Sequence, residues 1–188
     1  MADAMGVSLG RVFLVPGNHD VDRRHHVDRS LRRLLQSLRA GNEDLDESLQ
    51  DPWEKEQLLS RFHGLRGLLP ALGFGEQVTP EQALTGWTLP LGERGGLAVR
   101  LLGLNTSLLS MDDEDRGKLR LSRAALTRIG AEIPSGQKDE LVIALSHHPL
   151  AGDWLSERRE LAAFLRQRAQ VHLSGHVHEA ATDSARSG

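Results

Sequence analysis

The chain has 188 residues, of which 39% are hydrophobic and 26% charged, and its formal net charge is −3. These values exclude a disordered polypeptide, and the weak negative charge argues against nucleic-acid binding driven by overall charge. Cysteine is absent, which excludes disulfides and thiolate metal sites. The longest aliphatic run, residues 141–145, is too short to cross a membrane, and residues 1–5 lack the features of a signal peptide. We therefore expect no membrane association and a cytoplasmic location.

The first element expected along the chain is a strand, followed by a long helix. Residues 12–15 (VFLV) are rich in β formers and end at Pro16, which predicts a buried strand leading into a loop. Four leucines then follow the spacing of one buried helix face, and Gly41 marks the end of that helix. These leucines are Leu31, Leu34, Leu35 and Leu38.

A second helix is expected after Asp51, which can cap it. Pro52 suits the first helical position, and Glu54 would complete a capping box. Together these patterns predict a helical insertion over about residues 23–75.

Charge within this insertion is polarised along the sequence. Six arginines between residues 23 and 39 are followed by seven acidic residues between residues 43 and 56. One interpretation is a pair of solvated helix faces that partly neutralise each other. The other is a basic lid over an anionic substrate.

The second half of the chain predicts strands that alternate with helices. Residues 87–91 and 97–104 have the pattern of a hairpin, residues 141–145 that of a buried strand and residues 171–173 that of a last strand. Helices are expected from a Ser122 cap to about residue 133 and from a Ser156 cap to about residue 169. Alternating strands and helices indicate an α/β domain, and the hairpin indicates a mixed sheet.

Three histidine motifs come directly after predicted strands, at residues 17–20 (GNHD), 147–149 (HHP) and 175–178 (GHVH). Loops at strand ends are where α/β folds collect functional groups. In an extended segment His176 and His178 would point the same way, so that both imidazoles could reach one site. Imidazole and amide donors without sulfur suit zinc, manganese or iron.

In this order and context, the motifs resemble those of the calcineurin-like metallophosphoesterases, whose pattern is D-x-H, G-D, G-N-H-[DE], H-x-P and G-H-x-H. The last three are present, and the strand end at residues 102–106 (LGLNT) is also similar to the family. The resemblance implies an α/β fold with two mixed β-sheets sandwiched between helices, an α/β/β/α arrangement. It also implies two divalent metal ions (Mn, Fe or Zn) that activate a hydroxide for attack on phosphorus.

The resemblance also implies roles for individual residues. It assigns Asn18, His147 and His176 to one metal ion and His178 to the other. His19 would be the catalytic acid, and Asp20 would orient His19 or a metal ligand. His148 has no ligand role in the pattern and is a candidate for contact with the substrate.

Two motifs of the family pattern, D-x-H and G-D, are absent from residues 1–16. They would supply the remaining ligands of the metal ion assigned to His178 and the carboxylate that bridges both ions. We therefore expect residues 1–188 to form a single partial metallophosphoesterase domain, incomplete at both ends, with the missing motifs encoded upstream.

The leading hypothesis is a metal-dependent phosphoesterase acting on phosphomonoesters or phosphodiesters, with nucleotides and nucleic acids among the candidate substrates. A second hypothesis is a mononuclear zinc hydrolase in which His147, His176 and His178 hold one ion. A third is a non-catalytic phosphoesterase-like scaffold whose helical insertion binds a partner. Metal stoichiometry separates the first two hypotheses.

Overall fold

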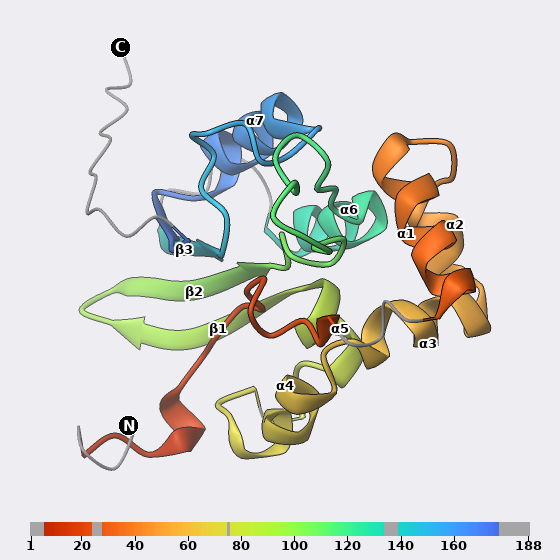
Figure 1. Ribbon diagram of the computed structural model, residues 1–188. Helices are drawn as coiled ribbons and strands as arrows, with labels where there is room; N and C mark the ends of the chain where they lie inside the picture. The colour runs from red at the N-terminus through yellow and green to blue at the C-terminus, as the bar shows by residue number, and fades with distance from the viewer. Residues whose placement is uncertain (1–5, 24–27, 75, 134–138, 177–188) are drawn as a thin grey trace.

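The computed structural model of the protein describes residues 6–23, 28–74, 76–133 and 139–176 (Figure 1). The chain first forms a helical region and then a sheet with two further helices. In chain order the elements are η2 (Leu9–Arg11), α1 (Arg29–Ala40), α2 (Leu45–Gln50), α3 (Pro52–Ser60), α4 (His63–Leu68), η4 (Leu69–Ala71), α5 (Pro80–Thr85), β1 (Gly86–Arg94), β2 (Leu97–Leu104), α6 (Arg123–Glu132), β3 (Glu140–Ser146), α7 (Arg158–Arg168) and β4 (Val171–Ser174).

The strands form one mixed sheet in the order β1-β2-β3-β4. β1 and β2 pair antiparallel as the predicted hairpin, whereas β2, β3 and β4 run parallel. The α/β class and the mixed sheet are therefore confirmed. The expected second sheet is not found among the described residues, which contain this four-stranded sheet alone.

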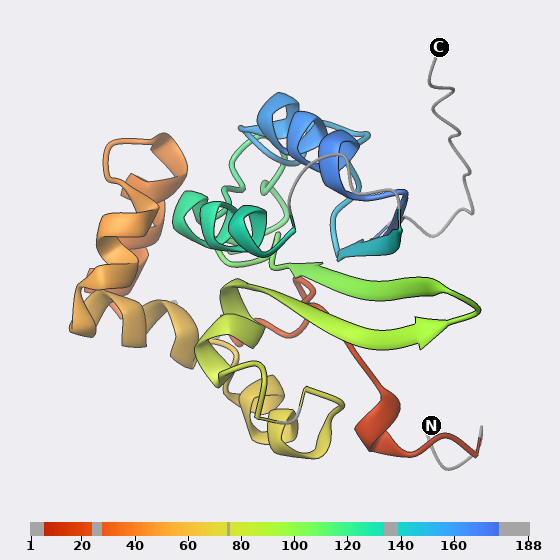
Figure 2. The ribbon, with the colours of Figure 1, turned by 180° about the vertical axis from the view of Figure 1, so that it is seen from behind.

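Helices cover the sheet on opposite sides (Figures 1 and 2). α6 and α7 lie together on one side of the sheet, while α4 lies on the other side. α1, α2 and α3 group beside the sheet, away from the β4 edge. No helix in the described part of the chain is long and apolar enough to cross a membrane.

The helical insertion forms largely as its sequence predicts. Asp28 caps α1 by accepting hydrogen bonds from two backbone N–H groups, and Gly41 ends the helix in the left-handed conformation with φ 75°. All four leucines of the predicted face are buried. Asp51 caps α3 as expected, through the N–H groups of Trp53 and Glu54.

Two of the predicted caps are different in the structure. The capping box with both reciprocal hydrogen bonds lies at α5, between Thr79 and Gln82, and Glu54 forms no such box at α3. Ser156 does not cap α7, whose preceding residue is Glu157. The Ser156 hydroxyl donates instead to the Leu119 carbonyl, because a bridge between Leu119 and Leu155 brings the two segments together.

Residues 12–15 do not form the predicted strand. Their apolar character has another cause: the segment is half-buried and packs on the sheet and the insertion. The Gly73 N–H donates to the Val12 carbonyl at 3.0 Å, and the Phe13 ring lies 6.1 Å from that of Phe74 and 6.5 Å from that of Trp87. A strand needs a ladder of backbone hydrogen bonds, and none of the described strands pairs with this segment.

Candidate metal centre

Three loops distant in the sequence bring their polar side chains to one point. Asn18 follows the first extended segment, His147 follows β3 and His176 follows β4. The Asn18 Oδ1 atom lies 2.9 Å from His147 Nε2, and His176 Nδ1 lies 3.1 Å from the same nitrogen. β3 and β4 are parallel neighbours, so the loops at their carboxyl ends must meet at one edge of the sheet.

Small residues allow these loops to approach closely. A Cβ atom at Gly17 would lie 2.9 Å from Nδ1 of His147, so only glycine fits against the imidazole. The Gly175 N–H donates to the His147 carbonyl at 3.1 Å and ties the two strand-end loops together. His176 has a φ of 67°, in the left-handed region, so this residue is not extended, and the predicted shared direction of His176 and His178 concerns residues 177–178, outside the described part of the chain.

His148 is the second histidine of its motif, and it lies buried behind His147 and His176. Its ring centroid is 4.8 Å from that of His147 and 4.5 Å from that of His176. Thr106 Oγ1 accepts the His148 backbone N–H at 2.9 Å and lies 3.0 Å from His148 Nδ1. One nitrogen from each of the three histidines lies within 4.8 Å of the others.

Trp154 forms an aromatic wall next to this cluster. Its ring lies edge-on to His176 at 4.3 Å between centroids and 5.5 Å from His148. The Arg116 guanidinium lies over the same indole ring at 5.2 Å. An aromatic wall beside imidazoles excludes water and lowers the local dielectric constant, which strengthens electrostatic interactions.

The environment lowers the pKa values of His147 and His148 and so keeps both neutral. Burial, followed by the neighbouring His176, lowers the pKa of His147 to about 4, although Asp20 opposes the shift. Burial, followed by His147 and His176, lowers the pKa of His148 to about 3. Neutral imidazoles have the free lone pair that a metal ion requires.

The donor set fits one divalent transition-metal ion. Ligands bonded at about 2.1 Å lie about 3.0 to 3.4 Å apart in octahedral or tetrahedral sites. The separations of 2.9 Å and 3.1 Å between the Asn18, His147 and His176 donors are close to that range. An amide oxygen and two imidazoles are suitable ligands for zinc, manganese or iron.

The other predicted site residues that the structure describes are His19 and Asp20. His19 is exposed on the rim of a cavity of about 540 Å³ that Asn18 also lines. Asp20 closes the loop, because its Oδ2 atom accepts the Gly17 N–H at 2.7 Å. The structure brings Asn18, His147, His148 and His176 together, whereas His178 lies outside the described residues.

A comparison with protein-family models identifies the chain. The model of the calcineurin-like phosphoesterases matches residues 3–180. The chain belongs to the calcineurin-like phosphoesterase family. No curated protein and no solved structure gives a match. The family accounts for the order of the three histidine motifs along the chain, and metal-dependent phosphoester hydrolysis is the chemistry that it suggests.

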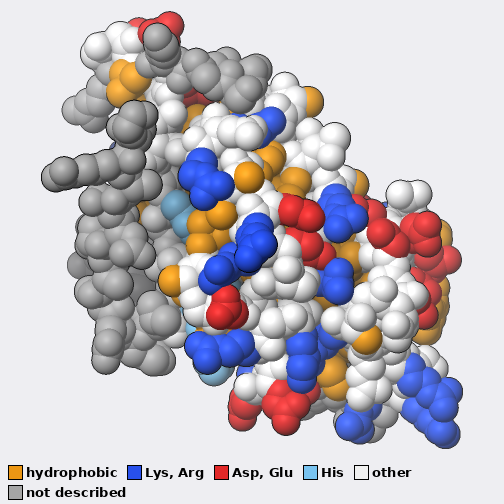
Figure 3. All heavy atoms as spheres, turned by 90° about the horizontal axis from the view of Figure 1, so that it is seen from above, with side chains coloured by type: hydrophobic (Ala, Val, Ile, Leu, Met, Phe, Trp, Pro, Cys, Tyr) orange, Lys and Arg blue, Asp and Glu red, His pale blue; other side chains and the backbone are white. Residues whose placement is uncertain are grey.

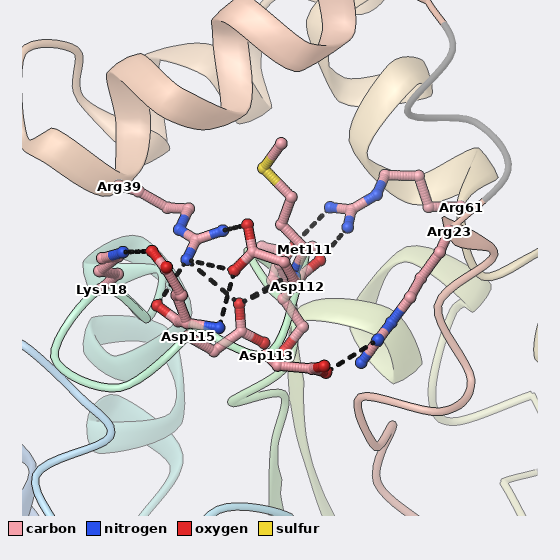
Figure 4. A network of polar contacts seen from close by, with 11 residues as sticks. Arg23, Arg39, Arg61, Met111, Asp112, Asp113, Asp115 and Lys118 are labelled. Atoms are coloured by element: carbon pink, nitrogen blue, oxygen red, sulfur yellow. Dashed lines mark hydrogen bonds and ion pairs between the residues drawn. The ribbon is translucent and has the colours of Figure 1, made fainter.

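The helical insertion holds the loop that follows β2 (Figure 4). Arg39 from α1 bonds both carboxylate oxygens of Asp112 at 3.1 and 3.3 Å and lies 3.3 Å from Asp115. Arg61, which is fully buried, donates to the carbonyls of Leu108 and Ser110. Thr106 lies near the start of the same loop, so the insertion supports the residue that contacts His148.

The acidic residues of this loop are occupied by protein partners. Asp115 accepts hydrogen bonds from the N–H groups of Met111 and Asp112, and Asp113 pairs with Arg23 at 3.2 Å. Burial raises the pKa of Asp112, but hydrogen bonds and the charge of Arg39 outweigh it and hold the pKa below its usual value. These carboxylates therefore serve to hold the loop in place.

Sequence reasoning missed Thr106 and Trp154 as parts of the site. Thr106 belongs to the strand end that resembles the family, and its position two residues after β2 was the available signal. Trp154 had no comparable signal, because its place depends on the bridge between Leu119 and Leu155.

On the surface seen from above, acidic and basic side chains are interspersed (Figure 3).

Proposed function

We propose that the protein is a metal-dependent phosphoesterase that hydrolyses phosphomonoester or phosphodiester bonds at a dinuclear metal site. The observation that carries this proposal is the convergence of Asn18 Oδ1, His147 Nε2 and His176 Nδ1. These atoms come from the three family motifs and have the spacing of ligands around one ion. Divalent ions held there would supply positive charge against phosphoryl oxygens and would acidify water.

His19 is proposed as the residue that gives a proton to the leaving oxygen. It follows Asn18 directly, so a group bound near the Asn18 amide lies within reach of its imidazole. Its exposed side chain lines the cavity, where a leaving group can enter and depart. Asp20 positions this loop through its hydrogen bond to the Gly17 N–H.

The helical insertion contributes to the same cavity and is proposed to take part in substrate selection. α4 supplies His63, Leu65 and Leu68 to the wall opposite His19. The leaving group of the ester would thus lie between the metal site and α4. A nucleotide or a nucleic-acid end remains among the candidate substrates.

Two of the six arginines that would form the basic lid are paired with carboxylates of the protein itself. Arg39 is buried on Asp112 and Asp115, and Arg23 pairs with Asp113. Their charges are used within the protein, which supports the interpretation that the charges of the insertion partly neutralise each other and those of neighbouring loops.

The second metal ion is proposed to use His178, as the family motif implies. The described residues supply a donor set for one ion, so binding of the first ion is expected to be the stronger. The alternative is a mononuclear site, for which His147, His176 and His178 were expected as ligands. The cluster of three imidazoles among the described residues contains His148 in place of His178.

Hydrolysis of bis(p-nitrophenyl) phosphate by the full chain, with and without added Mn²⁺, tests the proposal. We expect weak turnover that requires metal and disappears in His147→Gln. Metal binding without turnover above the metal-free blank would instead favour the non-catalytic scaffold. Turnover that persists in EDTA and in His147→Gln would contradict the proposal.

A further inference from the structure

We propose that His148 is a further metal ligand, binding through Nε2, and that Thr106 is the partner that orients its ring. The inference rests on the proposed metal site and adds to it a residue for which the family pattern gives no ligand role. The ion would be a divalent transition metal of the zinc class, which favours imidazole ligands.

The first observation is an unsatisfied polar atom. His148 is 1% exposed, and its Nε2 atom has no hydrogen-bond partner in the described part of the structure. A buried polar atom left without a partner costs about 1–3 kcal/mol. Eight other buried side-chain atoms of the described residues also lack a partner, so the unpaired Nε2 points to a ligand only together with its place in the histidine cluster.

The second observation is the place of this atom. The His148 ring lies within 4.8 Å, between centroids, of two rings whose nitrogens already face each other. One nitrogen from each residue lies within 4.8 Å of the others. Bonds of about 2.1 Å to a common ion place ligand atoms about 3.0 to 3.4 Å apart, so the most distant pair of nitrogens would have to close by up to about 1.4 to 1.8 Å.

Thr106 provides the hydrogen bond that a ligating histidine needs at its other nitrogen. Metal-bound histidines almost always donate their second ring N–H to an oxygen, which fixes tautomer and orientation. The Thr106 hydroxyl oxygen lies 3.0 Å from His148 Nδ1 and also accepts the His148 backbone N–H. Because a hydroxyl oxygen accepts two hydrogen bonds, both contacts are compatible with coordination through Nε2.

His172 shows how a histidine with a structural role differs. It is half-buried, whereas His148 is almost fully buried, and its Nε2 lies 2.8 Å from Ser146 Oγ. The Ser146 hydroxyl donates to the His148 carbonyl, so His172 Nε2–H donates to the Ser146 oxygen. This nitrogen is satisfied within the protein, and His172 is therefore a matched control.

Direct contact between His148 and the substrate, the role expected from the sequence, is disfavoured by the burial of the side chain. A metal ion can reach the cluster from the side of His147 and His176, which are only half-buried. A substrate several times larger would have to displace these residues first.

Cadmium-113 NMR of the full chain carrying ¹⁵N-labelled histidine tests the inference. We expect ¹¹³Cd–¹⁵N couplings to one nitrogen each of His147, His148 and His176. Couplings to His147 and His176 without His148 would overturn the inference and leave the proposed metal site standing. Absence of coupling to all three would overturn both.

Competition binding of Zn²⁺ gives a second readout. We expect His148→Gln to weaken Zn²⁺ binding at least about 10-fold, and Thr106→Val to weaken it about 10- to 100-fold. His172→Gln should bind as the wild type does. Melting of each metal-free variant shows whether it folds, and wild-type affinity in a folded His148→Gln would contradict the inference.

Discussion

The amide oxygen of Asn18 lies 2.9 Å from Nε2 of His147, although 129 residues separate the two in the sequence. One side chain comes from the amino-terminal loop and the other from the end of a central strand. Their meeting depends on the packing of the amino-terminal segment against the sheet. We therefore expect changes in this packing to alter the affinity for metal ions.

Gly17→Ala tests the close approach of the amino-terminal loop. The new Cβ atom would lie 2.9 Å from His147 Nδ1 and would push the ring away from Asn18. We expect metal affinity to fall about 10- to 100-fold, as for changes beside metal ligands, with a smaller effect on folding. Gly64→Ala is the matched control, because its Cβ would meet nothing within 4 Å. Isothermal titration with Zn²⁺ measures both, and equal affinities would contradict the geometry.

His19→Ala separates proton transfer from coordination. The proposed role predicts a loss of turnover of about 10²- to 10⁴-fold, typical of a general acid, with metal content unchanged. His176→Ala should lose metal and turnover together. Elemental analysis beside the phosphodiester assay distinguishes the two, and equal metal loss in both variants would show that the roles are wrongly assigned.

Stability of the metal-free protein should depend on pH through the buried histidines. In the unfolded chain these histidines titrate near pH 6.5, whereas burial lowers the pKa of His147 to about 4 and that of His148 to about 3. Between about pH 6.5 and 4 the unfolded state binds more protons, so the free energy of unfolding falls as the pH falls. Urea unfolding in EDTA between pH 7.5 and 5 measures this trend. His148→Gln should flatten it, and a flat wild-type profile would contradict it.

Arg61 should be important for folding because its guanidinium is fully buried. Burial, partly opposed by Asp115, lowers the pKa of Arg61 to about 10, so it is charged at neutral pH. Arg61→Met would leave the carbonyls of Leu108 and Ser110 without this donor. We expect a loss of about 3–5 kcal/mol in the free energy of unfolding, measured with urea.

Arg66→Met is the control for Arg61, because Arg66 pairs with Glu56 on the surface. Exposed pairs contribute about 0–1 kcal/mol, so this variant should unfold nearly as the wild type does. Similar losses in both variants would show that burial of Arg61 is not the cause.

Local patterns predicted much of this fold. The leucine spacing of α1, the hairpin of β1 and β2, and the Asp51 cap depend on neighbouring residues, and all three are confirmed. Residues 12–15 have the composition of a strand, but whether they pair depends on distant partners that composition does not specify. The same reason explains why Ser156 bonds to Leu119 instead of capping α7.

Only the residues of the candidate site that belong to the family motifs could be predicted from the sequence. Asn18, His147 and His176 converge as the family pattern implies. The contact between Thr106 and His148 depends on loop packing that the sequence does not encode in a local pattern. The conformation of His176 depends likewise on the loop that follows β4, so its left-handed φ could not be predicted from the alternation of side chains along a strand.

Anomalous diffraction from crystals of the full chain grown with Zn²⁺ tests the central claim most directly. The account predicts a zinc peak bonded to Asn18 Oδ1, His147 Nε2 and His176 Nδ1. A peak on the acidic residues of the loop after β2, or the absence of any peak near His147, would contradict it.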